Sequence, residues 1–275
     1  MTFLSGGAEK LTVLVTVKAY PSLSTKYGEG VCVAGVRLDT PAREWVRLFP
    51  VPFRDMPKSR QFRKWDIIEV EARRHSGDPR IETWRPNVDT VTVGDHVPSD
   101  HGWISRTPYI EHFFGPTMCE LRRGRVGGGD GASLGLVRPR EIKGIVVRAE
   151  EERTEKKRSI AAQGSLLAAT PKRELDQIPW AFHYSYVCED PACKGHEQKI
   201  ADWEIGQAYR AWRLRKPEKD AIEDVKKKWL GMMGESKRDL SFFVGDQHQY
   251  PGGFMVLGTF YPERVKVDPQ LDLFT

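Results

Sequence analysis

Residues 182–204, FHYSYVCEDPACKGHEQKIADWE, form the stretch around which the C-terminal half of the chain is organised. Aromatic side chains alternate with others over residues 182–187, a pattern that predicts a β-strand leading into the first cysteine. The turn that follows gathers Cys188, Cys193 and His196, and a helix-like pattern comes next. Thiols and an imidazole this close together, between a strand and a helix, predict a bound metal ion.

The spacing of these three residues favours zinc. Four residues separate Cys188 from Cys193, and two separate Cys193 from His196, which is close to the spacing of knuckle-type turns. We therefore predict a Zn²⁺ site with a fourth ligand, for which His248 is the first choice because it lies in a loop between two predicted strands. The alternatives are Cys119, His183, Asp202 and water. The competing hypothesis is that the cysteines are packing residues or an adventitious disulfide, with the histidine on the surface.

Composition sets limits on the class of protein. The chain has 275 residues with 39% hydrophobic content, enough for one large domain or two modest ones. Four cysteines are too few for a disulfide scaffold, the first ten residues do not resemble a signal peptide, and no apolar run approaches the roughly 20 residues that span a bilayer. We expect a cytoplasmic protein with reduced thiols and no membrane partner. The sequence does not predict an oligomeric state.

The N-terminal half is expected to be rich in β-structure. Short alternating runs divided by turn residues predict an antiparallel barrel or curled sheet. The predicted strands are 11–19, 31–38, 44–49, 66–73 and a short one at 91–93, with 134–137 and 142–147 expected to close the barrel.

Residues 150–158 carry no apolar side chain, which is typical of a connector. The following half mixes strands with two helices that begin after Asp202 and at Pro217. The sequence thus predicts an α+β protein with a barrel-like domain at 1–148, a charged connector at 149–177 and an α/β metal-binding domain at 178–275.

Basic residues alternate with aromatic ones in the region 45–85, a combination that suits a nucleic-acid surface because cations contact phosphates while rings stack on bases. The net charge of +5 permits such a partner, DNA included, without requiring one. The competing interpretation is that the aromatics are core residues and the cations a solvated rim. The candidate contact residues are Arg47, Arg54, Arg60, Arg63, Lys64 and Arg73.

Asp202 and Glu204 at the start of the predicted helix admit two interpretations. They can be a helix cap and a first-turn acid, or they can serve catalysis beside an open metal position or a magnesium ion. Three functions follow from these patterns. The first is a nucleic-acid-binding or nucleic-acid-processing protein with a zinc-type site. The others are a metal-dependent hydrolase acting on a phosphorylated or nucleotide-like substrate, with Glu197 as a further candidate, and a protein-interaction adaptor with structural zinc.

Overall fold

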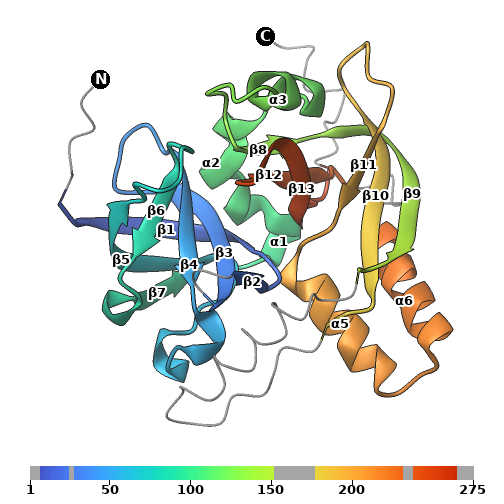
Figure 1. The fold of residues 1–275 in the computed structure, drawn as a ribbon, viewed down its shortest axis with the longest axis horizontal. Helices are drawn as coiled ribbons and strands as arrows, with labels where there is room; N and C mark the ends of the chain where they lie inside the picture. The colour runs from blue at the N-terminus through green and yellow to red at the C-terminus, as the bar shows by residue number, and fades with distance from the viewer. Residues whose placement is uncertain (1–6, 25–27, 152–176, 232–237, 265–275) are drawn as a thin grey trace, which may run out of the picture.

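The computed structural model describes residues 7–24, 28–151, 177–231 and 238–264. It shows an α+β fold in which a closed five-stranded barrel packs against two three-stranded sheets and several helices (Figure 1). The barrel strands follow the order β1-β3-β4-β6-β5, and pairing of β5 with β1 closes the ring. Their bounds are β1 Glu9–Lys18, β3 Gly28–Arg37, β4 Trp45–Val51, β5 Asp66–Arg74 and β6 Thr83–Pro86; β2 Ser22–Ser24 pairs with β3, and β7 Thr92–His96 pairs with β5.

Alternation along the strands explains the barrel. In β5 every second residue is buried in the barrel core. In β1 the alternate residues Leu11, Val13 and Val15 lie in that core, while Leu14 and Val17 pack into a second cluster, so β1 is covered on both faces. The predicted strands are present, each within a few residues of its expected bounds. The sequence did not reveal the short strands β2, β6 and β11; in β6, the four residues that end in Pro86 carry almost no alternation.

Two further sheets lie beside the barrel. The first has the order β13-β12-β8, with β8 Leu134–Val137, β12 Ser241–Gln247 and β13 Tyr250–Phe260. The second has the order β11-β10-β9, with β9 Pro139–Ala149, β10 Trp180–Cys188 and β11 His196–Lys199. In Figure 1 the β8–β12–β13 sheet stands between the barrel and the β9–β10–β11 sheet.

The expectation that 134–137 and 142–147 close the barrel was wrong. Both segments are strands, but β8 pairs with β12 and β9 pairs with β10. The reason is that β1 and β5 already pair along six positions, so the ring has no free edge to accept another strand there.

The helices occupy the junctions between these sheets. They are α1 Asp100–Trp103, α2 Thr107–Ile110, α3 Met118–Arg125, α5 Trp203–Arg213 and α6 Glu218–Gly231. Asp202 caps α5 by accepting a hydrogen bond from the Glu204 amide, as the cap interpretation predicted. The buried faces of α5 and α6 pack into the core of the β9–β10–β11 sheet.

The division at 1–148, 149–177 and 178–275 stays a prediction, and most of the expected connector lies outside the described residues. Across the described ranges, no helix combines the length and the apolar character that a membrane span requires.

Candidate functional site

Four side chains meet at the end of the β9–β10–β11 sheet. Cys188 ends β10, Cys193 lies in the turn, His196 begins β11, and Cys119 comes from the first turn of α3. Their ligand atoms all lie within 4.8 Å of one another, so this Cys₃His group could bind a metal ion. None of the cysteines forms a disulfide, which removes that alternative.

The distances fit a tetrahedral ion. His196 Nε2 lies 3.3 Å from the sulfur of Cys193, 3.4 Å from that of Cys188 and 3.5 Å from that of Cys119. The sulfurs of Cys119 and Cys188 are 3.7 Å apart. A tetrahedral zinc ion with bonds of about 2.3 Å to sulfur and 2.0–2.1 Å to nitrogen would hold sulfurs about 3.8 Å apart and the nitrogen about 3.5–3.6 Å from each. The group therefore has the dimensions of a four-ligand site with no open position.

The close packing of the thiols in this group favours a bound cation. Burial raises the pKa of Cys119 to about 12, and the thiols of Cys188 and Cys193 act in the same direction. Burial also acts to raise the pKa of Cys193, but amide hydrogens of Cys188 and Gly195 point at its sulfur from 3.4 Å and lower the pKa. Thiolates packed this closely need a compensating positive charge, which a bound metal ion supplies.

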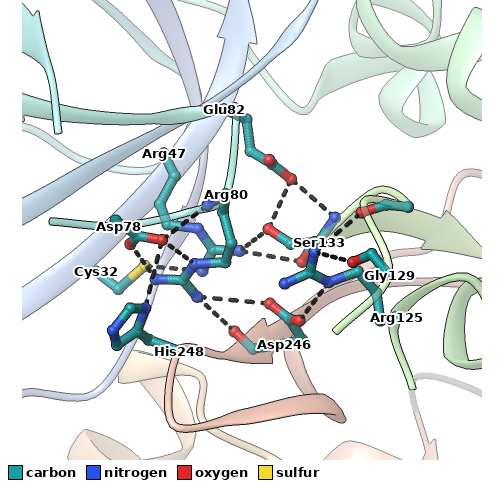
Figure 2. A network of polar contacts seen from close by, with 11 residues as sticks. Cys32, Arg47, Asp78, Arg80, Glu82, Arg125, Gly129, Ser133, Asp246 and His248 are labelled. Atoms are coloured by element: carbon teal, nitrogen blue, oxygen red, sulfur yellow. Dashed lines mark hydrogen bonds and ion pairs between the residues drawn. The ribbon is translucent and has the colours of Figure 1, made fainter. Parts of the chain in front are cut away.

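His248, the first choice for the fourth ligand, lies elsewhere, and Cys119 takes that place. The turn between β12 and β13 carries His248 to the β5–β6 connection, where its Nδ1 is 3.5 Å from a carboxylate oxygen of Asp78 (Figure 2). The ladder that joins β12 to β8 directs this turn toward the barrel rather than toward the cysteines.

His248 belongs to the rim of a buried polar network that joins the barrel to the rest of the chain (Figure 2). Arg80 contacts both oxygens of Asp78 and donates to the Asp246 carbonyl at 2.8 Å. Arg125, at the end of α3, donates to the Asp246 carboxylate at 2.9 Å. These guanidinium groups and carboxylates balance one another within the network.

Arg47 is part of the same network, so its expected place on a nucleic-acid surface was wrong. It is only 3% exposed and donates to the carbonyl and hydroxyl of Ser133 at 3.0 and 2.8 Å. Ser133 in turn donates to Glu82 at 2.9 Å from its amide and 2.6 Å from its hydroxyl. Arg47 lies between the buried residues Val46 and Leu48 of β4, and the chain around Ser133 covers it.

The other predicted contact residues lie in three environments. Lys64 is buried between Asp202, at 2.8 Å, and Glu204, at 3.2 Å. Arg54 and Arg60 are partly exposed and pair with Glu29 and Asp89, each at 2.8 Å. Arg63 and Arg73 are exposed. The set does not form one open surface.

Asp202 and Glu204 have the structural roles that the cap interpretation predicts. Asp202 is buried, caps α5 and forms an ion pair with Lys64. Neither Asp202 nor Glu204 is among the ligands of the Cys₃His group. Glu197 makes two contacts with Arg148, at 2.6 and 2.8 Å. No open metal position beside these acids is present among the described residues, and a catalytic role for them stays a prediction.

A pocket of about 460 Å³ lies beside the barrel. Its walls come from the end of β1, the segment before β5, α1, the start of α5, the end of α6 and β13. Cations exceed carboxylates in its lining, since only Glu204 is acidic among the lining residues. The cations are Lys18, Arg63, Lys64, Arg106 and Lys228. The rings are Trp65, Trp103, Trp203, Trp229 and Tyr261, with His96 beside them.

Sequence reasoning found three of the four members of the metal group and missed most of the pocket. Cys119 lies 69 residues before Cys188, so spacing gave no signal for it. A capping box at Thr117 and Glu120, which the sequence does contain, could have identified the helix that presents Cys119. Arg63 and Lys64 were found through the basic and aromatic pattern, whereas Trp103 and Arg106 lie outside it.

Comparison with known proteins gives two family matches. Residues 114–275 match the model of a family described as a domain of unknown function, DUF8757, and residues 9–112 match that of a second, DUF8758. The four residues of the Cys₃His group all fall within the first match, whereas the pocket and the polar network draw residues from both. No curated protein gives a significant match.

Among solved structures, a murine DNA-binding protein bound to double-stranded DNA aligns with 94% of this chain and 98% of its own, at 10% identity and a TM-score of 0.30. At this level of similarity the match supports no conclusion about function.

Proposed function

The chain belongs to the DUF8757 family, and from the geometry of its two sites we propose that it is a nucleic-acid-binding protein with a structural zinc ion. The proposal includes a cytoplasmic location, which rests on the sequence alone. The observation that supports nucleic-acid binding is the pocket, where five cations and five aromatic rings line one space with a single carboxylate. Cations attract phosphates, and rings stack on bases of any sequence.

The zinc ion is proposed for Cys119, Cys188, Cys193 and His196. Four protein ligands fill a tetrahedral shell, which is typical of structural zinc, whereas catalytic zinc keeps a position for water. The same geometry argues against the hydrolase hypothesis. An ion here would fix α3 against the ends of β10 and β11.

The metal is tested by elemental analysis of tag-free full chain. We expect about one zinc per chain in the wild type and in Cys32→Ser, whose cysteine lies outside the group. In Cys119→Ser we expect loss of the metal together with a lower melting temperature. Protein free of metal in the wild type, or Cys119→Ser with full metal content, would refute the proposed site.

Nucleic-acid binding is tested by fluorescence anisotropy with labelled single-stranded and double-stranded oligonucleotides at several salt concentrations. If three to five phosphates are neutralised, the logarithm of the binding constant should fall against the logarithm of salt concentration with a slope of about −2 to −4.5. Absence of salt-dependent binding to both oligonucleotides would overturn the proposal.

A further inference from the structure

Two cations in the pocket, the buried Arg106 and the partly buried Lys18, have no described carboxylate within ion-pair distance. Arg106 is 5% exposed, donates from Nε to the Val97 carbonyl at 3.1 Å, and has no described carboxylate within ion-pair distance. Lys18 donates to the Phe62 carbonyl at 3.3 Å and is likewise without an ion pair among the described residues. A charge removed from water is normally paired because its desolvation is costly. An anion bound in the pocket would therefore supply the negative charge that these two cations lack.

The pKa values agree with this geometry. Burial lowers the pKa of Lys18 to about 8; the adjacent Lys64 adds to the effect, and the more weakly acting carboxylates of Glu204, Asp202 and Asp66 oppose it. Burial lowers the pKa of Arg106 to about 10. Titratable groups perturbed by burial within a pocket mark a candidate functional site, and a bound anion would offset the cost of burying these charges.

The rings of the pocket are held in an unusual backbone conformation. Trp65 and Trp103 have φ angles of 70° and 73°, in the left-handed region that bulky residues rarely adopt. The guanidinium of Arg106 lies 4.6 Å from the ring centroids of both. Such conformations are strained for a bulky side chain and cluster at functional sites, where the surrounding structure holds them. Here they hold two rings and one cation at the pocket wall.

Part of the ring surface remains available to a ligand. Trp103, Trp203 and Tyr261 are half-buried, and the rings of Trp103 and Tyr261 lie 4.3 Å apart, centroid to centroid. A ligand that contacts both the exposed ring surface and the two cations must therefore combine a planar group with an anion. A nucleotide has both, since its base can stack on a ring while its phosphate contacts the cations.

We propose that the pocket binds one nucleotide unit, with its phosphate at Lys18 and Arg106 and its base against the half-buried rings. This inference rests on the proposed function and names the part of the nucleic acid that the pocket holds. The unit can be free or can belong to a strand whose base has left the stack. The pocket volume of about 460 Å³ lies in the range of small-molecule sites.

The test is calorimetric titration of the full chain with a nucleoside 5′-monophosphate, the matching nucleoside, inorganic phosphate and a single-stranded oligonucleotide. The monophosphate should bind at least about tenfold more tightly than the nucleoside or phosphate alone, because only it engages both parts of the wall. Lys18→Met should weaken monophosphate binding by about 10- to 100-fold, as expected for loss of a charged contact. Lys10→Met, on the same strand but 66% exposed, is the matched control and should bind as the wild type does.

The outcomes separate this inference from nucleic-acid binding in general. Salt-dependent oligonucleotide binding that Lys18→Met leaves unchanged, with no monophosphate binding, would refute the pocket and retain the proposed function. Monophosphate binding without oligonucleotide binding would retain the pocket as a nucleotide site and refute the proposed nucleic-acid-binding function. If Lys18→Met fails to fold, quenching of wild-type tryptophan fluorescence by the monophosphate decides, since four tryptophans line the pocket. No quenching and no heat of binding would refute the inference.

Discussion

Two groups of cations around the same barrel differ in how their charge is compensated. Arg80 and Arg125 form ion pairs with Asp78 and Asp246 in the network of Figure 2, where Arg47 reaches Glu82 only through Ser133. Lys18 and Arg106 contact only backbone carbonyls and aromatic rings among the described residues. The first group therefore ties two parts of the fold together by ion pairs, whereas the second lines a pocket and has the place that the proposed nucleotide site requires.

The largest effect should come from breaking the paired group. In Asp246→Asn, Arg80 and Arg125 both lose the carboxylate they contact, and we expect the free energy of unfolding to fall by about 3–5 kcal/mol. Urea denaturation of the full chain measures it. Asp239→Asn is the control, since Asp239 pairs with Arg138 at the surface, and it should change stability by less than about 1 kcal/mol. Equal effects in the two variants would mean that the network is not a major tie between the two parts.

The unpaired group should respond in the opposite direction. Lys18→Met removes a partly buried charge that has no described carboxylate within ion-pair distance, so the unliganded protein should gain up to about 1 kcal/mol of stability while losing affinity for the monophosphate. Thermal denaturation with and without ligand measures both effects. Lys10→Met should change neither. A destabilised Lys18→Met variant would show that this cation has a structural partner and would remove the contrast between the two groups.

A pH titration sharpens the role of Asp78. Burial acts to raise its pKa, but hydrogen bonds from Arg80 outweigh this and lower it to about 2. Because the folded-state pKa lies below the unfolded value, ionised Asp78 stabilises the fold above about pH 4, and this contribution disappears as the pH falls toward 2. The stability difference between wild type and Asp78→Asn should shrink by about 1 kcal/mol across that window, after allowance for solvent screening. A constant difference from pH 5 to pH 2 would contradict it.

The smallest effect is expected at the rim. His248 is half exposed and lies 3.5 Å from Asp78, so His248→Gln should change stability by less than about 0.5 kcal/mol. Its zinc content should equal that of the wild type, because His248 lies outside the Cys₃His group. Loss of zinc in this variant would return His248 to the list of ligands.

Local sequence patterns predicted the features that depend on residues close together in the chain, namely most strands and one turn of the metal group. Alternation identified most strands, and the spacing of Cys188, Cys193 and His196 identified one side of the metal group, because a single turn brings these three together. Cys119 could not be chosen over His248 in this way, because the choice depends on which distant element packs against the turn.

The pocket and the network were hidden for a related reason. Lys18, Trp103 and Arg106 come from separate elements, and no pattern in one segment indicates that they share a wall. Arg47 shows the same limit, since the basic and aromatic pattern of its region does not indicate that the chain around Ser133 covers it. Strands and turns are encoded by neighbours in sequence, whereas the partners of buried charges are set by tertiary packing.

The ladder between β9 and β10 has a consequence for the covalent continuity of the chain. Ala149 lies opposite Trp180, and the Glu150 amide donates to the Pro179 carbonyl at 2.8 Å, so the residues on either side of 151–178 are neighbours in space. A gene split within 152–176 would yield one polypeptide that supplies Cys119 and another that supplies Cys188, Cys193 and His196. The two fragments should associate through the β9–β10 ladder. Because the metal ligands would come from both fragments, the amount of bound metal would report the fraction of fragments that have associated.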